Sequence, residues 1–201
     1  MKKQVVVIHG GDTFDTYEKY LRFLKRFDID FEDYIGEKKG WKSNLQASLG
    51  EEYEVALPDM PNSFNAKYPE WQIWFEKFIP FLNGGVILVG HSLGGTFLAK
   101  YLSENTFQKK ISGVFLISAP FDDAPDYSLV DFALPKKLNL QTKNVVIYHS
   151  SDDRVVPFVD LNKYSSAINN ATVKQFADRG HFKQPEFSEL VEDIKNLGLN
   201  S

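Results

Sequence analysis

The chain has 201 residues, no cysteine, 14% aromatic residues and a formal net charge of −4 at pH 7. That length suits a single domain with a core of ordinary size, and the lack of cysteine excludes thiolate nucleophiles, cysteine-held metals and disulfides. The mildly acidic balance argues against nucleic-acid binding, which needs a basic surface, so any chemistry here depends on oxygen and nitrogen side chains.

Near its start the chain has two lysines, Lys2 and Lys3, and then a short aliphatic run over residues 5–8. This start imitates the basic end of a secretory signal peptide, but its apolar stretch stops too early, at His9-Gly10-Gly11. We therefore expect a first strand and a cytoplasmic protein. The longest aliphatic runs hold four residues. A membrane span needs about 20, so no membrane contact is expected.

Four short aliphatic runs predict the strands of a parallel sheet. They are β-branched and continuous instead of alternating, which is typical of strands that are buried on both faces. The four runs and two weaker candidate strands lie at residues 5–8, 86–89, 114–117, 145–148, 53–57 and 172–176.

Helical patterns lie between these strands. The one over residues 69–82 opens with a proline and carries aromatic residues at helical spacing. Further helices are predicted at residues 92–104, 158–168 and 186–197. The alternation favours an α/β fold with three layers, in which a doubly wound, mostly parallel sheet of about six strands forms one domain over residues 1–201.

The first crossover, between residues 12 and 52, holds two helical patterns instead of one. One apolar stripe runs through residues 16–27, and another runs through residues 40–49. If the second is the crossover helix, residues 12–39 leave the carboxyl end of the first strand, where active sites of such sheets lie, and form a small lid. If the first is the crossover helix, the extra helix is only structural. We favour the lid.

The segment Gly90-His91-Ser92-Leu93-Gly94 fits the pattern G-x-S-x-G between a predicted strand and a predicted helix. This is the setting of a nucleophile elbow, a sharp turn in which the glycines give clearance and the strained serine projects from the sheet. We predict Ser92 as a nucleophile and the Leu93 amide as a donor to the oxyanion. The alternative is a glycine-rich turn with a capping serine.

A serine hydroxyl needs a base, and the chain offers four histidines. His91 precedes the nucleophile, while His9 and His149 end predicted strands. His181 lies beside Gly180 in a loop after the last strand, and in sheets with this elbow the order is serine, acid, histidine. We therefore predict His181 as the base, against the alternative of a surface-loop histidine.

The acid is expected just after the strand at residues 145–148. Asp152 and Asp153 compete there, and the frame Asp-x-x-Val-Pro favours Asp153, with Asp152 capping the turn or bracing the loop. Asp122 and Asp123 form a less favoured alternative. The acid would orient the base and stabilise its protonated form.

A second oxyanion donor is expected from the loop after the first strand, where Gly11 has no side chain to keep its amide away from the developing charge. Loops at strand ends are expected to line an apolar pocket, and we predict Phe64, Phe121 and Phe158 as substrate-binding residues. Such aromatics, Phe132 among them, can equally pack the rim of the core. No metal and no organic cofactor is predicted.

Together these residues resemble the α/β-hydrolase superfamily and, within it, the small, essentially capless serine hydrolases grouped with a retinoblastoma-binding protein. The resemblance implies that Ser92, Asp153 and His181 are the nucleophile, acid and base. It spans nearly the whole chain, through His9-Gly10-Gly11, Trp41 with Leu45 and Leu49, residues 57–61, Gly90-His91-Ser92, Ser151-Asp152-Asp153 with Pro157, and Gly180-His181-Phe182 followed by Glu186-Phe187.

The resemblance also matches residues 41–49 to the family's first crossover helix, which supports a lid at about residues 12–39. That segment is longer than the family's usual loop, so the resemblance does not extend to substrate preference. We expect a serine hydrolase of small carboxylic esters that acts on a small-molecule acyl substrate. Two alternatives are a thioesterase, amidase or peptidase with the same triad, and a protein-binding module that uses the triad little.

Overall fold

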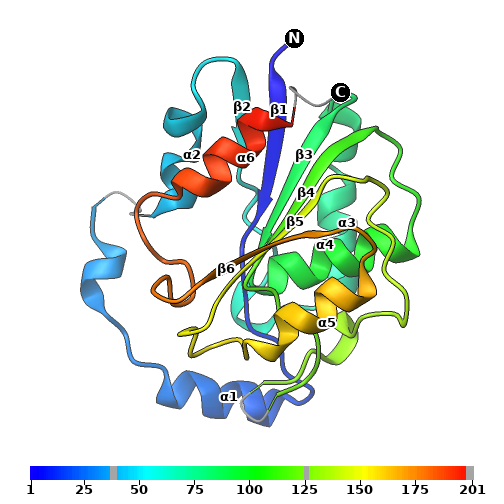
Figure 1. Ribbon diagram of the computed structural model, residues 1–201. Helices are drawn as coiled ribbons and strands as arrows, with labels where there is room; N and C mark the ends of the chain where they lie inside the picture. Colours follow the sequence, from blue (N-terminus) through cyan, green and yellow to red (C-terminus); the bar gives the residue numbers. More distant parts are fainter. Residues whose placement is uncertain (37–39, 125–126, 198–201) are drawn as a thin grey trace.

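The structure is a computed structural model, which describes residues 1–36, 40–124 and 127–197 (Figure 1). Its centre is one sheet of six strands in the order β2-β1-β3-β4-β5-β6, and every neighbouring pair is parallel. This confirms the predicted architecture, including both weaker strands. The strands are β1 (Lys3–Ile8), β2 (Tyr53–Ala56), β3 (Val86–His91), β4 (Ile111–Ile117), β5 (Val145–Ser150) and β6 (Thr172–Phe176).

Helices cover both faces of the sheet, so the central strands are apolar on both sides. In β1, Val5 and Val7 face one core cluster and Val6 and Ile8 face the other, and all four side chains are fully buried. Helices α2 (Trp41–Leu49) and α6 (Ser188–Asn196) cover the first of these faces. Helices α3 (Tyr68–Glu76), α4 (Leu93–Glu104) and α5 (Val159–Ala167) cover the second.

The predicted helix over residues 69–82 is wrong at its C-terminal end. Helix α3 ends at Glu76, and the chain continues into the short 3-10 helix η3 (Ile79–Phe81). Pro80 explains the break, because proline has no amide hydrogen to donate and disfavours helical conformation at the residue before it. Two further 3-10 helices are η2 (Ser63–Asn65) and η4 (Val130–Phe132).

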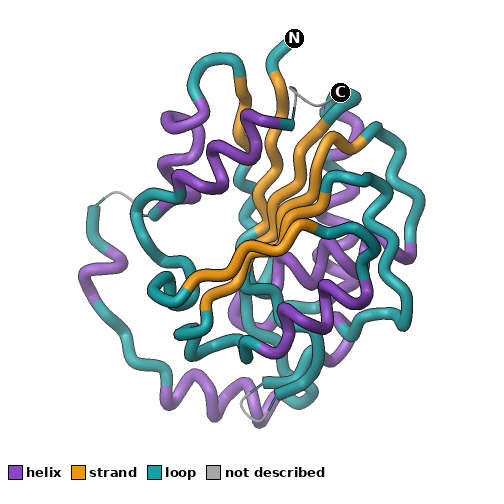
Figure 2. Tube along the Cα trace, viewed as in Figure 1, coloured by secondary structure: helices purple, strands orange, loops and turns teal. Residues whose placement is uncertain are grey.

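The first crossover helix is α2, not α1 (Tyr17–Arg26). Helix α2 buries Trp41, Leu45 and Leu49 against the sheet, whereas no residue of α1 is buried. Helix α1 therefore belongs to an excursion between β1 and α2, which also contains the 3-10 helix η1 (Phe31–Tyr34). Figure 2 shows this excursion as loop and short helices that run outside the sheet, with α1 on the side where the strands end.

No helix formed by the described residues has the length and apolar character required to span a membrane.

Candidate active site

The predicted nucleophile lies at a strained turn between β3 and α4. Ser92 has φ 54° and ψ −130°, which places a non-glycine residue in the left-handed half of conformational space. Its backbone N–H donates to the Ile117 carbonyl at the end of β4 (2.8 Å), and this bond holds the turn against the sheet. Leu93 follows as the first residue of α4, so its amide lies at a helix N-terminus.

The glycines of the motif are required by close packing. A Cβ on Gly90 would lie 2.5 Å from Gly95 Cα, and a Cβ on Gly94 would lie 2.3 Å from the Ile8 carbonyl oxygen. Both contacts are with backbone, which cannot swing away as a flexible side chain can. The elbow therefore reaches its place beside β1 only because these positions carry no side chain.

The loop after β1 approaches the predicted nucleophile closely. A Cβ on Gly10 would lie 2.9 Å from Ser92 Cβ, and one on Gly11 would lie 2.7 Å from the Ser63 carbonyl oxygen. His9 holds this loop in place: its Nε2 accepts the Met60 amide (2.8 Å), so Nδ1 carries the hydrogen and donates to the Gly10 carbonyl (2.6 Å).

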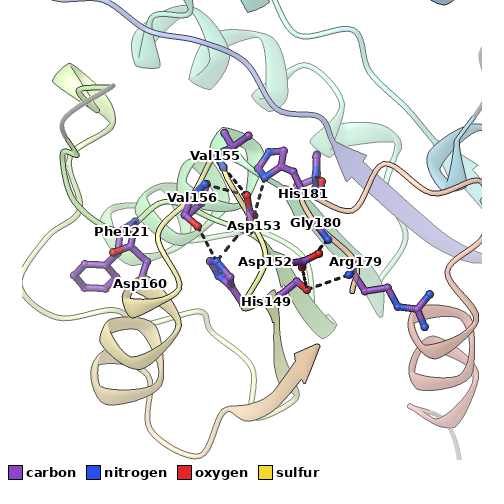
Figure 3. Close-up of polar contacts among 12 residues, drawn as sticks. Phe121, His149, Asp152, Asp153, Val155, Val156, Asp160, Arg179, Gly180 and His181 are labelled. Carbon is purple, nitrogen blue, oxygen red and sulfur yellow. Dashed lines mark hydrogen bonds and ion pairs between the residues drawn. The ribbon is translucent and has the colours of Figure 1, made fainter. Parts of the chain in front are cut away.

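The predicted base and acid form a direct pair. His181 Nδ1 lies 2.9 Å from Asp153 Oδ2, and the Asp153 side chain is completely shielded from solvent (Figure 3). Asp153 Oδ1 accepts the Val155 and Val156 amides, at 2.8 and 3.1 Å. Burial alone would raise the pKa of Asp153, but the hydrogen bond and charge of His181, with these two amides, hold it below its ordinary value.

This pair fixes the tautomer of the base. An ionised carboxylate only accepts hydrogen bonds, so His181 Nδ1 carries the hydrogen and Nε2 keeps its lone pair free to accept a proton. The hydrogen bonds among the described residues do not include one from Ser92 Oγ to His181. Such bonds are commonly long in the absence of substrate and tighten when substrate binds.

Asp152 stabilises the loop, as expected from the sequence for the aspartate that is not the acid. Its Oδ1 accepts the Ser150 hydroxyl and the Gly180 amide, the latter at 2.9 Å. Ser150 Oγ in turn accepts the Arg179 amide at 3.1 Å. The loop that carries His181 is therefore tied to the end of β5. Neither of the alternative acids, Asp122 and Asp123, contacts His181: Asp122 pairs with Lys163, and Asp123 accepts from residues of its own loop.

Two histidines near the pair were not given a role from the sequence. His149 donates from Nε2 to the Val156 carbonyl (3.1 Å) and lies 4.0 Å from Asp153 Oδ2. His91 Nε2 lies 2.8 Å from the His181 carbonyl oxygen. Their position at the ends of β5 and β3 was the available signal, because carboxyl ends of parallel strands meet at one edge.

The three predicted substrate-binding phenylalanines have different neighbours. Phe64 contacts Phe27 edge-on (5.4 Å between ring centroids) and borders a pocket of about 580 Å³ with Tyr20. Phe121 packs edge-on against Tyr164 at 4.9 Å. Phe158 contacts the ring of His149 edge-on at 5.6 Å, and His149 Nε2 lies 4.0 Å from Asp153 Oδ2. Their contact with substrate stays a prediction.

Phe132 is a core residue. It is fully buried and packs edge-on against Tyr68 and Trp71. Within the described part of the chain, no three histidine, aspartate or glutamate side chains gather as a metal site would require.

A single parallel sheet with a strained serine after β3 and an aspartate–histidine pair beyond β5 and β6 is the arrangement of the α/β hydrolases. Residues 35–194 match the model of the Serine hydrolase family, and the chain belongs to that family.

Relatives in sequence and structure agree with this assignment. The chain is 24% identical over 165 residues to the serine hydrolase RBBP9 of Rattus norvegicus, covering 79% of this chain and 84% of the relative. It is 22% identical over 191 residues to the hydrolase YdeN of Bacillus subtilis, covering 92% and 89%. The crystal structure of the ydeN gene product superimposes with a TM-score of 0.70 at 19% identity, covering 99% of this chain and 100% of that one.

A fourth similarity extends to a more distant structure. Est1E from Butyrivibrio proteoclasticus superimposes with a TM-score of 0.59 at 14% identity, covering 98% of this chain and 87% of that one. At this identity the similarity concerns the fold alone.

Proposed function

We propose that this serine hydrolase is of the carboxylesterase type and cleaves small carboxylic esters through an acyl-enzyme intermediate in the cytoplasm. The observation that carries the proposal is the 2.9 Å contact of His181 with a fully shielded Asp153, at the same sheet edge as the strained Ser92. No cofactor takes part in the proposed reaction.

In the first half of the reaction, Ser92 Oγ attacks the carbonyl carbon of the ester and its proton passes to His181 Nε2. The carbonyl oxygen becomes an oxyanion, which the amides of Leu93 and Gly11 would stabilise. Asp153 stabilises the imidazolium without taking its proton. The intermediate then collapses, the bond to the alcohol oxygen breaks, and His181 returns the proton to the leaving alcohol.

In the second half, a water molecule gives its proton to His181 Nε2 and attacks the acyl carbon. The bond between that carbon and Ser92 Oγ breaks, Oγ recovers a proton from His181, and the carboxylic acid leaves.

A fluorophosphonate probe tests the nucleophile, because it phosphonylates only an activated serine. We expect the wild-type protein to be labelled and Ser92→Ala to be unlabelled. The control Ser166→Ala removes a serine of α5 whose hydroxyl bonds within its own helix, and labelling persists in it. A folded wild-type protein that resists the probe would refute the enzymatic proposal.

Activity on matched p-nitrophenyl esters, thioesters and aminoacyl amides then tests the bond. Faster turnover of esters supports the esterase, whereas preference for another series assigns a thioesterase, amidase or peptidase, since the triad itself does not choose among these.

One observation favours a second candidate, a protein-binding module. The excursion between β1 and α2 exposes large aromatic side chains: Tyr17 is 64%, Phe31 is 70% and Tyr34 is 61% exposed. Exposed apolar patches on a folded protein often mark a contact surface. The two candidates differ in the probe experiment, because a binding module that uses its triad little is not labelled.

We also propose that residues 12–39 act as a lid, of which the structure describes 12–36 and not 37–39. Asp12, at the start of this segment, supports the proposal. Partial desolvation raises the pKa of Asp12, and the charge of His181 opposes that rise. Asp12 and Thr13 bond to the backbone of Ser63 and Ala66. Further along the segment, Phe23 and Phe27 contact Phe64, and the ammonium of Lys67 donates to the Phe14 carbonyl.

A further inference from the structure

The loop that carries His181 is held on a second side, away from β5. Helix α2 and the end of β3 supply this hold. His91 Nε2 donates to the His181 carbonyl (2.8 Å), and Trp41 Nε1 donates to the next carbonyl along, that of Phe182 (2.9 Å). The backbone N–H of Trp41 donates to the Gln184 carbonyl at 3.0 Å. The carbonyls of His181 and Phe182 therefore accept hydrogen bonds from His91 and Trp41, two side chains that take no part in the proposed reaction.

The conformation of the loop depends on these bonds. Phe182 has φ 51°, in the left-handed region that non-glycine residues rarely adopt, and its ring is fully buried against Phe176 and Phe187. Strained backbone of this kind persists where surrounding contacts over-determine it. The turn at Phe182 directs the carbonyls of residues 181 and 182 toward β3 and α2, and the donors there are both buried.

The base loop also supplies hydrogen-bond acceptors to the N-terminus of helix α2. Its N-cap residue, Gly40, has no side chain to accept from the first amides of the helix. The Gln184 carbonyl accepts from the first of them, at Trp41, and Asn44 in the same helix donates to the Pro185 carbonyl (3.0 Å). Helix α2 and the base loop thus complete one another's hydrogen bonding.

His91 is suited to a fixed donor role. Its ring is 6% exposed, contacts Trp41 edge-on and lies 4.8 Å from the ring of His181. Burial holds the pKa of His91 well below its ordinary value, and the charges of Lys42, His181 and Lys183 lower it further. His91 therefore stays neutral, with its hydrogen on Nε2, and adds no positive charge beside the base when the base is protonated.

We propose that Trp41 and His91 are positioning residues for the base: their N–H groups fix the carbonyls of residues 181 and 182 and thereby aim His181 Nε2. This inference rests on the proposed esterase function. Asp153 holds one end of the imidazole ring, while Trp41 and His91 hold the backbone from which the ring projects. A displacement of about 1 Å in a reacting group can cost on the order of 100-fold in rate, so loss of this hold reduces turnover.

The test compares donors that are removed with donors that are kept. Trp41→Phe keeps an aromatic ring and loses the indole N–H. His91→Leu loses its donor, whereas His91→Gln keeps an amide donor near the position of Nε2. We expect Trp41→Phe and His91→Leu to lower kcat for a p-nitrophenyl ester at least about tenfold with little change in KM, and His91→Gln to recover most of it.

A control separates positioning from general loss of stability. Gln141→Met, in the connection that precedes β5, removes three side-chain hydrogen bonds: Nε2 donates to the carbonyls of Leu102 and Asn105, and Oε1 accepts the Phe107 amide. It is expected to lower resistance to urea while leaving kcat unchanged. If Trp41→Phe and His91→Leu behave like this control, the positioning proposal is overturned.

A spectroscopic readout keeps the test independent of turnover. The hydrogen between His181 Nδ1 and Asp153 is expected to give a strongly downfield proton resonance, assigned by its absence from His181→Gln. Trp41→Phe and His91→Leu are expected to shift or broaden it, and an unchanged resonance in both variants counts against the proposal. A wild-type protein with this resonance but neither turnover nor probe labelling would refute the esterase proposal alone.

Discussion

Two adjacent aspartates after β5 differ in burial and in hydrogen-bond partners. The Asp153 side chain is fully shielded from solvent and accepts a hydrogen bond from His181 Nδ1, whereas Asp152 lies at the surface and accepts the amide of Gly180. Both lie within hydrogen-bond reach of the same loop, yet only Asp153 contacts the imidazole ring. A single residue step along a tight turn therefore separates a carboxylate that contacts the imidazole ring from one that contacts only the backbone of its loop.

Replacing each aspartate by asparagine distinguishes these roles. In Asp153→Asn the amide presents an N–H or a weaker acceptor to His181 Nδ1, which favours the wrong tautomer. We expect kcat for a p-nitrophenyl ester to fall by about 10⁴-fold, the loss known for this change in serine proteases. Asp152→Asn, which keeps an oxygen acceptor for Gly180, is expected to lose no more than about tenfold. The reverse order would assign the acid to Asp152.

At the scale of elements, the excursion between β1 and α2 sets this chain apart from a minimal sheet of this kind. Helix α1 has a complete apolar stripe, but the sheet offers no face to cover it, because α2 already occupies the crossover position. Tyr17, Leu21 and Leu24 of that stripe remain exposed. An amphipathic helix with a partly exposed stripe at the edge where the strands end is suited to contact substrate.

Deleting residues 16–36 tests the lid. We expect a folded enzyme that still cleaves the p-nitrophenyl acetate ester but loses preference for longer acyl chains, since each apolar CH₂ removed from contact costs about 0.8 kcal/mol. As a milder change, Leu21→Ser with Leu24→Ser alters exposed side chains only, and Arg26→Ser, at an exposed position on the opposite face of the helix, is the control. If kcat/KM across acyl lengths is unchanged in both the deletion and the double variant, the lid proposal is wrong.

At the scale of the whole molecule, two buried histidines link folding to pH. Burial lowers the pKa of both His91 and His149, so each stays neutral in the folded protein at pH values where it would be charged in the unfolded chain. The unfolded state then binds more protons, and stability falls as pH decreases below the unfolded pKa of about 6.5. The pKa of Asp153 is also lowered, but from a lower ordinary value, so its contribution to stability is lost in the same direction and only as the pH falls below about 4.

We therefore expect the free energy of unfolding in urea to decrease between about pH 7 and about pH 5, with a slope of up to roughly 2.7 kcal/mol per pH unit for two histidines. His149→Gln removes one titrating group and is expected to reduce the slope by about half. A free energy of unfolding that stays constant over this interval would contradict the neutral, buried state of these rings.

Local patterns in the sequence were sufficient to predict the sheet and to propose the central residues of a candidate site. Continuous β-branched runs indicate strands buried on both faces, because such strands carry no polar alternation. The four runs form β1, β3, β4 and β5, and the two weaker candidates form β2 and β6. The G-x-S-x-G turn, the late histidine and the aspartate after β5 follow from short spacings along the chain. The contact between His181 and Asp153 agrees with that prediction, while the chemistry of the two residues awaits the experiments above.

Only the tertiary structure decided which of two amphipathic helices covers the sheet and what surrounds each aromatic side chain. The apolar stripes of α1 and α2 are similar in sequence. The crossover helix is the one whose stripe packs against an apolar face of the sheet, and only α2 does so. Trp41 reaches the carbonyl of Phe182 across 141 residues of chain, and no local pattern encodes that bond. Packing between distant segments sets such contacts, because hydrophobic burial fixes where each backbone carbonyl of the base loop meets its donor.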